Sequence, residues 1–150
     1  HITIHGGEWA GPENIALAIN KLHAKRIGHG VRIFEDKSIV DLVMEKNIHF
    51  EVCPTSNYQS GIFSDIADHS LGKMQTTGIN YSINTDDPSI SQIVLTDEYL
   101  LANEVFGITL AQILDSNINA AKAAFIPQTQ KDKLVKSLKV EYSNLLSSQT

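Results

Sequence analysis

This sequence of 150 residues contains a single cysteine, carries no net positive charge and has no long apolar run. The single cysteine, Cys53, cannot form an internal disulfide, so an oxidising compartment is not implied. A formal net charge of -5, without a basic stripe, argues against a nucleic-acid partner, because phosphate binding needs clustered Lys and Arg. No apolar run reaches transmembrane length, so we expect no membrane contact and a cytoplasmic location.

Two familiar zinc motifs are absent as well. A site of the cytidine deaminase type needs Pro-Cys-x-x-Cys, which a sequence with one cysteine cannot contain. The His-Glu-x-x-His helix of zinc proteases is also missing. A metal site in this chain would therefore be built from residues that lie far apart in the sequence.

Strands and helices alternate along the chain. Apolar residues make up 42% of the sequence, which is enough for one core, so we treat residues 1–150 as one domain. Thr109-x-x-Gln112 predicts a capping box. The pattern predicts strands at 2–5, 26–30, 49–53 and 80–85, a loop at 54–57, and helices at about 12–23, 37–44, 71–77, 97–105, 110–124 and 130–146.

Polar residues stand where these strands end. The ends at His5, His29 and Cys53 are spaced evenly, and a longer connection leads to Asp86. This alternation indicates a parallel sheet, either doubly wound or part of a barrel. Working residues of a barrel lie at the carboxyl ends of its strands, which favours an α/β fold of the (β/α)8 TIM-barrel type. Four strands make half a barrel, so we expect four more strands before residue 1.

The segment His5-Gly6-Gly7-Glu8 joins two chemically useful groups. A neutral His binds zinc, and Glu is a common general acid or base. Taken alone, His-x-x-Glu at a strand end is more often an ordinary polar loop, and Asp86-Asp87-Pro88 is more often a turn and a helix start. Four further residues of metal-binding type are interpreted as structural: Cys53, His23, His49 and His69.

Four motifs follow one another along the chain: His5-Gly6-Gly7-Glu8, Arg26-Ile27-Gly28-His29-Gly30, Cys53-Pro54-Thr55-Ser56-Asn57 and Ser82-Ile83-Asn84-Thr85-Asp86-Asp87-Pro88. In this order and spacing they resemble the carboxyl-terminal half of the adenosine/AMP deaminase family of amidohydrolase barrels. The resemblance extends from residue 1 to about residue 125. Gly6 stands where the family usually has Ala, and both residues are small.

The resemblance implies zinc-dependent hydrolytic deamination of adenosine and deoxyadenosine to inosine and ammonia, a step of purine salvage. It implies that His5 and Asp86 bind one Zn2+ ion. Glu8 would protonate the purine N1, because attack at C6 sends electrons to that nitrogen. His29 would orient and deprotonate the attacking water, and Asp87 would bond to the purine N7.

The family's first-strand His-x-His, which supplies two zinc ligands, has no counterpart in this sequence. We therefore expect activity only together with the amino-terminal half of the barrel. Half a barrel would expose strand edges and apolar faces, so we expect it to bind the complementary half or a second copy. A non-catalytic half-barrel fragment is the alternative from another class.

Three positions bear on the substrate. Adenine deaminases of the same family tend to have Asp where Gly28 stands, Leu at Thr55 and Ser at Thr85, so these residues favour the nucleoside over the free base. Adenine deaminase remains the alternative enzyme. AMP deaminase is less favoured, because no basic cluster for a 5′-phosphate is apparent in the sequence.

Overall fold

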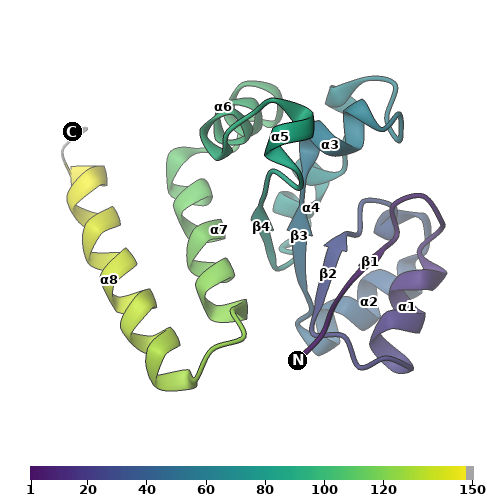
Figure 1. Cartoon of the computed structure of the whole chain (residues 1–150), viewed down its shortest axis with the longest axis horizontal. Helices are drawn as coiled ribbons and strands as arrows, with labels where there is room; N and C mark the ends of the chain where they lie inside the picture. Colours follow the sequence, from purple (N-terminus) through teal and green to yellow (C-terminus); the bar gives the residue numbers. More distant parts are fainter. Residues whose placement is uncertain (148–150) are drawn as a thin grey trace.

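A four-stranded parallel sheet organises the computed structural model, which describes residues 1–147 (Figure 1). The strands lie side by side in chain order: β1 (Thr3–Gly6), β2 (Arg26–His29), β3 (His49–Val52) and β4 (Tyr81–Ile83). Gly6 pairs with His29, and Val52 pairs with Ile83. The carboxyl ends of all four strands therefore meet at one edge of the sheet, as the sequence predicts.

Eight helices of the described chain follow the strands, and those that pack on the sheet cover one of its faces. They are α1 (Glu13–Asn20), α2 (Lys37–Lys46), α3 (Pro54–Gln59), α4 (Leu71–Thr77), α5 (Pro88–Ser91), α6 (Leu95–Phe106), α7 (Leu110–Ala123) and α8 (Gln128–Ser147), with short 3-10 turns at Ile33–Glu35 and Ile66–Asp68. α1 packs on β1, α7 packs on β3 and β4, and α8 packs on α7. Figure 1 shows α3, α5 and α6 gathered at the carboxyl end of the sheet. Among residues 1–147, no helix combines the length and hydropathy that spanning a membrane requires.

The two faces of the sheet differ in polarity, because successive side chains of a strand point to opposite sides. One face buries Ile27, Phe50 and Ile83 under the helices. Neighbouring residues on the other face form a lateral row of polar and small side chains, which is His5, Gly28, Glu51 and Ser82. The core thus lies between the sheet and the helices, and the opposite, polar face of the sheet is available to line a functional site.

Most predicted boundaries agree with the structure, but the loop predicted at 54–57 is wrong. The structure has helix α3 there, with Pro54 in its first turn, where a missing N–H costs nothing. The carboxylate of Glu98 in α6 accepts hydrogen bonds from the Thr55 N–H, which satisfies a donor at the start of α3. The predicted capping box is confirmed, because Thr109 and Gln112 bond reciprocally.

Substitution of Gly30, at the end of β2, tests how tightly the sheet packs around the Phe50 ring. The φ of Gly30 is +66°, and an added Cβ would collide with the fully buried ring of Phe50. Gly61 also has a positive φ, +79°, but a Cβ there would meet open space. We expect Gly30→Ala to lower the free energy of unfolding by about 3 kcal/mol, and Gly61→Ala by about 1 kcal/mol. Urea denaturation measures both, and equal losses would contradict the packing argument.

Candidate functional site

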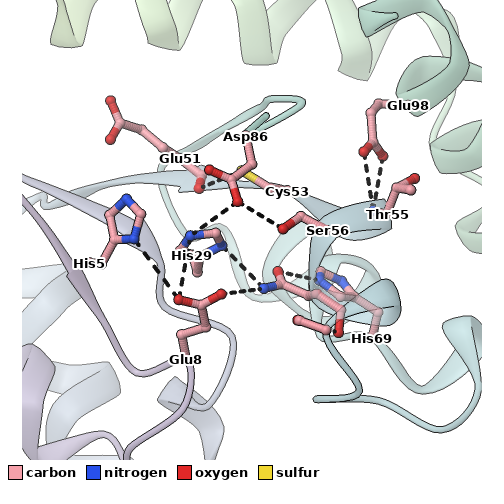
Figure 2. A network of polar contacts seen from close by, with 12 residues as sticks. His5, Glu8, His29, Glu51, Cys53, Thr55, Ser56, His69, Asp86 and Glu98 are labelled. Carbon is pink, nitrogen blue, oxygen red and sulfur yellow. Dashed lines mark hydrogen bonds and ion pairs between the residues drawn. The ribbon is translucent and has the colours of Figure 1, made fainter. Parts of the chain in front are cut away.

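Side chains from three strand ends converge at the carboxyl edge of the sheet. Ligand-type atoms of His5, His29 and Asp86 all lie within 4.8 Å of one another. Figure 2 shows these three residues and Glu8 turned toward a common point. All four residues are candidates from the sequence, and the structure brings them together, whereas their individual roles stay predictions.

Glu8 lies between the two imidazoles. Its Oε2 atom is 4.0 Å from His5 Nδ1 and 3.6 Å from His29 Nε2. The Glu8 side chain is only 12% exposed, but the His5 side chain is 68% exposed. The rings of His5 and His29 meet edge to face, with centroids 4.7 Å apart. A carboxyl group in this position can exchange a proton with any molecule bound between the rings.

The His5 ring occupies space that a glycine leaves open. Gly28 is its lateral neighbour in β2, and a Cβ at Gly28 would lie 2.7 Å from Cδ2 of His5. A contact this short would force the ring to move. The absence of a side chain at Gly28 therefore helps to determine where the imidazole lies.

Two of the converging residues have an unusual backbone conformation. His29 and Asp86 both lie in the left-handed region, with φ of 65° and 62°. Residues other than glycine seldom adopt it, and each costs about 1 kcal/mol. Asp86 is held there by Ser56, whose hydroxyl donates to Asp86 Oδ2 at 2.8 Å. The same oxygen lies 4.0 Å from His29 Nε2.

His29 is the most buried member of the cluster, with 1% of its surface exposed. Burial lowers the pKa of His29, and the nearby carboxylate of Glu8 opposes this effect in part. Burial also lowers the pKa of His69, to about 3. Both rings are therefore favoured in the neutral form, in which one nitrogen donates a hydrogen bond and the other accepts one.

Helix α3 contributes functional contacts that sequence reasoning missed. The Nδ2 atom of Asn57 donates to Glu8 Oε1 at 3.3 Å and lies 3.1 Å from His29 Nδ1. Asn57 Oδ1 lies 3.2 Å from Nε2 of His69, a histidine expected to be structural. Asn57 is fully buried. Its place directly after a strand end, inside one of the four motifs, is the signal that could have identified it.

The two adjacent aspartates face different targets. Asp87 Oδ1 accepts hydrogen bonds from the N–H groups of Ser89 and Ile90 and so caps α5. The backbone of Asp87 is extended, with φ −111° and ψ 93°, as a residue before proline should be. Asp86 instead points to Ser56 and His29. Asp87 uses one oxygen as a cap, so its predicted purine contact would fall to the other.

The donor atoms of the cluster fit a zinc ion. Imidazole nitrogen and carboxylate oxygen are ordinary zinc ligands, and His5, His29 and Asp86 offer both kinds. A zinc site needs three or four protein ligands. Cys53 does not belong to this set, because it is buried, lies 3.5 Å from the Glu51 carbonyl oxygen and has a raised pKa. It is a structural residue, as the sequence indicates.

A parallel α/β sheet with His and Asp side chains converging on its carboxyl edge defines part of an amidohydrolase-type barrel. The chain belongs to the adenosine deaminase family, whose model matches residues 1–141 under the description "Adenosine deaminase". It is 37% identical to mouse adenosine deaminase over 142 residues, which is 95% of this chain and 40% of the mouse protein. The resemblance of the four motifs is thereby confirmed.

Solved structures agree with this assignment. An amidohydrolase from Burkholderia ambifaria with bound Zn superposes with a TM-score of 0.89 at 27% identity, over 97% of this chain and 41% of that chain. Adenine deaminase from Arthrobacter aurescens gives a TM-score of 0.88 at 26% identity, over 94% of this chain and 43% of that one. The TM-scores confirm the TIM-barrel type of fold, and the chain spans less than half the length of these proteins.

The stability of the protein should depend on pH because of Glu98, the residue that accepts the hydrogen bonds at the start of α3. Glu98 is fully buried, and burial raises its pKa from 4.5 to about 7. The folded state thus holds this proton more tightly than the unfolded state, so stability falls as the pH rises from about 4.5 to about 7. Glu98→Gln cannot ionise. We expect the stability of this variant relative to the parent to increase by up to about 3 kcal/mol across this window.

Urea denaturation at about pH 4.5 and about pH 8 measures the difference. Glu104→Gln in the same helix is the matched control, because Glu104 is exposed. Its stability relative to the parent should not change over the same range. A flat difference for Glu98→Gln would show that Glu98 ionises freely in the folded protein.

Proposed function

We propose that this chain forms the proton-transfer side of a zinc-dependent adenosine deaminase. The observation that carries the proposal is the convergence of His5, Glu8, His29 and Asp86 at one edge of a parallel sheet. Membership of the adenosine deaminase family supports it. The reaction would convert adenosine or deoxyadenosine and water to inosine or deoxyinosine and ammonia, within cytoplasmic purine salvage.

His5 and Asp86 would hold the zinc ion, and the remaining ligands would come from outside these 150 residues. When bound, zinc supplies a nucleophilic water at neutral pH, because it lowers the pKa of that water to about 7. The zinc in the related Burkholderia structure supports this choice of metal. The single carboxylate of Asp86 limits the charge of the ligand set, which eases burial of the site.

Glu8 would act as the proton donor. When a water oxygen bonds to C6 of the purine, the C6–N1 double bond opens and its electrons move to N1, which takes the proton of Glu8. The C6–N bond to the amino group then breaks, and this group takes one proton of the attacking water and leaves as ammonia. The second proton of that water returns to Glu8 as the C6=O bond forms. Because Oε1 of Glu8 accepts a hydrogen bond from Asn57, the transferable proton would lie on Oε2, the oxygen that faces both imidazoles. His29 would orient the water, and Asp87 would contact the purine N7.

Gly28, Thr55 and Thr85 support adenosine as the substrate over free adenine. Adenine deamination is the second candidate, supported by the structural match to the Arthrobacter enzyme. A nucleotide substrate is less favoured. Arg26 and Arg32 of the described chain pair with carboxylates, at 3.0 Å from Glu51 and 2.7 Å from Glu35, instead of offering free cations for a phosphate. Turnover of adenosine, adenine and AMP by the complete barrel distinguishes the three.

Two variants of the complete barrel test the assigned roles. Glu8→Gln removes the proton donor, so we expect zinc content to stay normal and adenosine turnover to fall by at least about 100-fold. Asp86→Asn removes a ligand, so we expect zinc affinity itself to fall by at least about tenfold. Zinc analysis and kcat measure both changes. The control is Glu45→Gln, an exposed position in α2 that should match the parent. Near-normal turnover in Glu8→Gln would refute the proton-donor role.

We further propose that the chain works bound to a complementary barrel half, or to a second copy. Within the described sheet, β1 and β4 each pair with a strand on one side only. Ile2, beside β1, is 45% exposed, and the polar face of the sheet has no covering layer among the described helices. Edges and faces of this kind invite pairing.

The mass of the purified species tests this assembly. We expect a mass well above the 16.5 kDa of one chain, measured by light scattering, because the exposed edges of β1 and β4 favour association. Zinc and deaminase activity together would identify the complementary half as the partner. A monodisperse 16.5 kDa species would contradict the proposal.

A further inference from the structure

Behind His29 lies a buried chain of hydrogen bonds that the proposed reaction does not yet use. It runs from the Leu71 backbone through His69 and Asn57 to His29. The residues His69, Asn57 and His29 are 3%, 0% and 1% exposed, so little solvent competes for these bonds. Each link has a definite donor and acceptor, and the first link determines the others.

The backbone N–H of Leu71 points at Nδ1 of His69, 3.1 Å away. A backbone N–H can only donate, so Nδ1 of His69 must accept. A neutral imidazole carries one proton, and that of His69 is therefore on Nε2. This Nε2–H donates to Oδ1 of Asn57 at 3.2 Å. The orientation of the Asn57 amide follows from a main-chain group.

With its oxygen bound to His69, Asn57 turns its NH2 group toward the cluster. Nδ2 lies 3.1 Å from His29 Nδ1 and 3.3 Å from Glu8 Oε1, so its two protons have one acceptor each. A flipped amide would place its NH2 against the Nε2–H of His69 and leave both buried donors unsatisfied. Nδ1 of His29 is thus an acceptor, and the proton of its neutral ring lies on Nε2.

We propose that Asn57 and His69 are positioning residues that set the tautomer of His29. His29 then presents an Nε2–H to the site, 3.6 Å from Glu8 Oε2 and 4.0 Å from Asp86 Oδ2. In this tautomer Nε2 has no free lone pair, so the resting ring orients the attacking water by donating to it. This proposal replaces the second role that the family resemblance implies for His29, deprotonation of the water. The role of His29 toward water rests on the proposed deaminase function. The assignment of its tautomer rests only on the hydrogen bonds.

Nitrogen NMR of the histidine rings reads the tautomer directly. We would record ring 1H–15N correlations of the metal-free complete barrel at about pH 8, above the ordinary histidine pKa of about 6.5. We expect His29 with its proton on Nε2. His49 is an internal reference for the opposite tautomer: Asn80 Nδ2 donates to Asn47 Oδ1, so Asn80 Oδ1 faces His49 Nδ1 at 2.9 Å.

Substitutions at Asn57 and His69 should move the proton. Asn57→Asp offers an acceptor where the parent has a donor, so Nδ1 of His29 becomes protonated. His69→Leu frees the amide to flip, so both tautomers of His29 appear, and His69→Gln restores a donor and the parent tautomer. The control is Asn117→Asp in α7, which keeps the acceptor for the Tyr99 hydroxyl and should leave the His29 signals unchanged.

Kinetics with zinc give the functional readout. We expect Asn57→Asp to lower kcat for adenosine by about 100-fold while KM changes by less than about threefold, because the change acts on orientation of the water. His69→Leu should lower kcat by about tenfold, and His69→Gln should recover most of it. Equal losses in His69→Leu and His69→Gln would indicate a packing role and overturn the proposal.

The outcomes separate the two proposals. A proton on Nδ1 of His29 in the parent protein overturns the positioning proposal, even if adenosine is deaminated. The NMR measurement on the parent protein needs no variant. It therefore tests the positioning proposal even if a substituted protein fails to fold. A parent protein with the expected tautomer but without deaminase activity would instead refute the proposed function and leave the positioning of His29 established.

Discussion

The parallel hydrogen-bonded register of the four strands is the constraint on which the rest of the structure depends. A strand that slipped by one residue would exchange its polar and apolar faces. His5 would then point into the helices, and Ile4 would enter the site. The observed pairing of His5 with Gly28 and of Gly6 with His29 instead keeps the imidazoles at one edge. The hydrogen-bonded pairing of the strand backbones thus determines where the side chains of the site lie.

A second layer of order comes from helix α3, which links the helical shell to the site. Its first turn is held by Glu98 from α6, and its Ser56 and Asn57 side chains reach Asp86 and His29. The left-handed backbones of His29 and Asp86 sit directly beside these contacts. Rigid support of this kind lets the fold maintain a locally unfavourable backbone where function needs it.

The sequence allowed the sheet and the converging residues to be predicted, because both depend on local signals. His5 near the end of one strand and Asp86 shortly after another are visible within a few residues, and the parallel arrangement then brings such ends together. The helix at 54–57 was missed because the Thr55 N–H finds its partner, Glu98, 43 residues later. Asn57 stood inside a recognised motif, but its bond to His29 spans 28 residues, and no local pattern encodes the direction of an amide.

The incomplete ligand set has a thermodynamic consequence. In the proposed site, His5 and Asp86 would be two of the three or four ligands that zinc requires, so a bound ion would bridge this chain and whatever supplies the others. Ion binding and closure of the barrel would then be linked reciprocally: each would strengthen the other by the same factor. In such a protein a chelator would act as a dissociating agent, and the metal would hold the two halves together as well as taking part in the reaction.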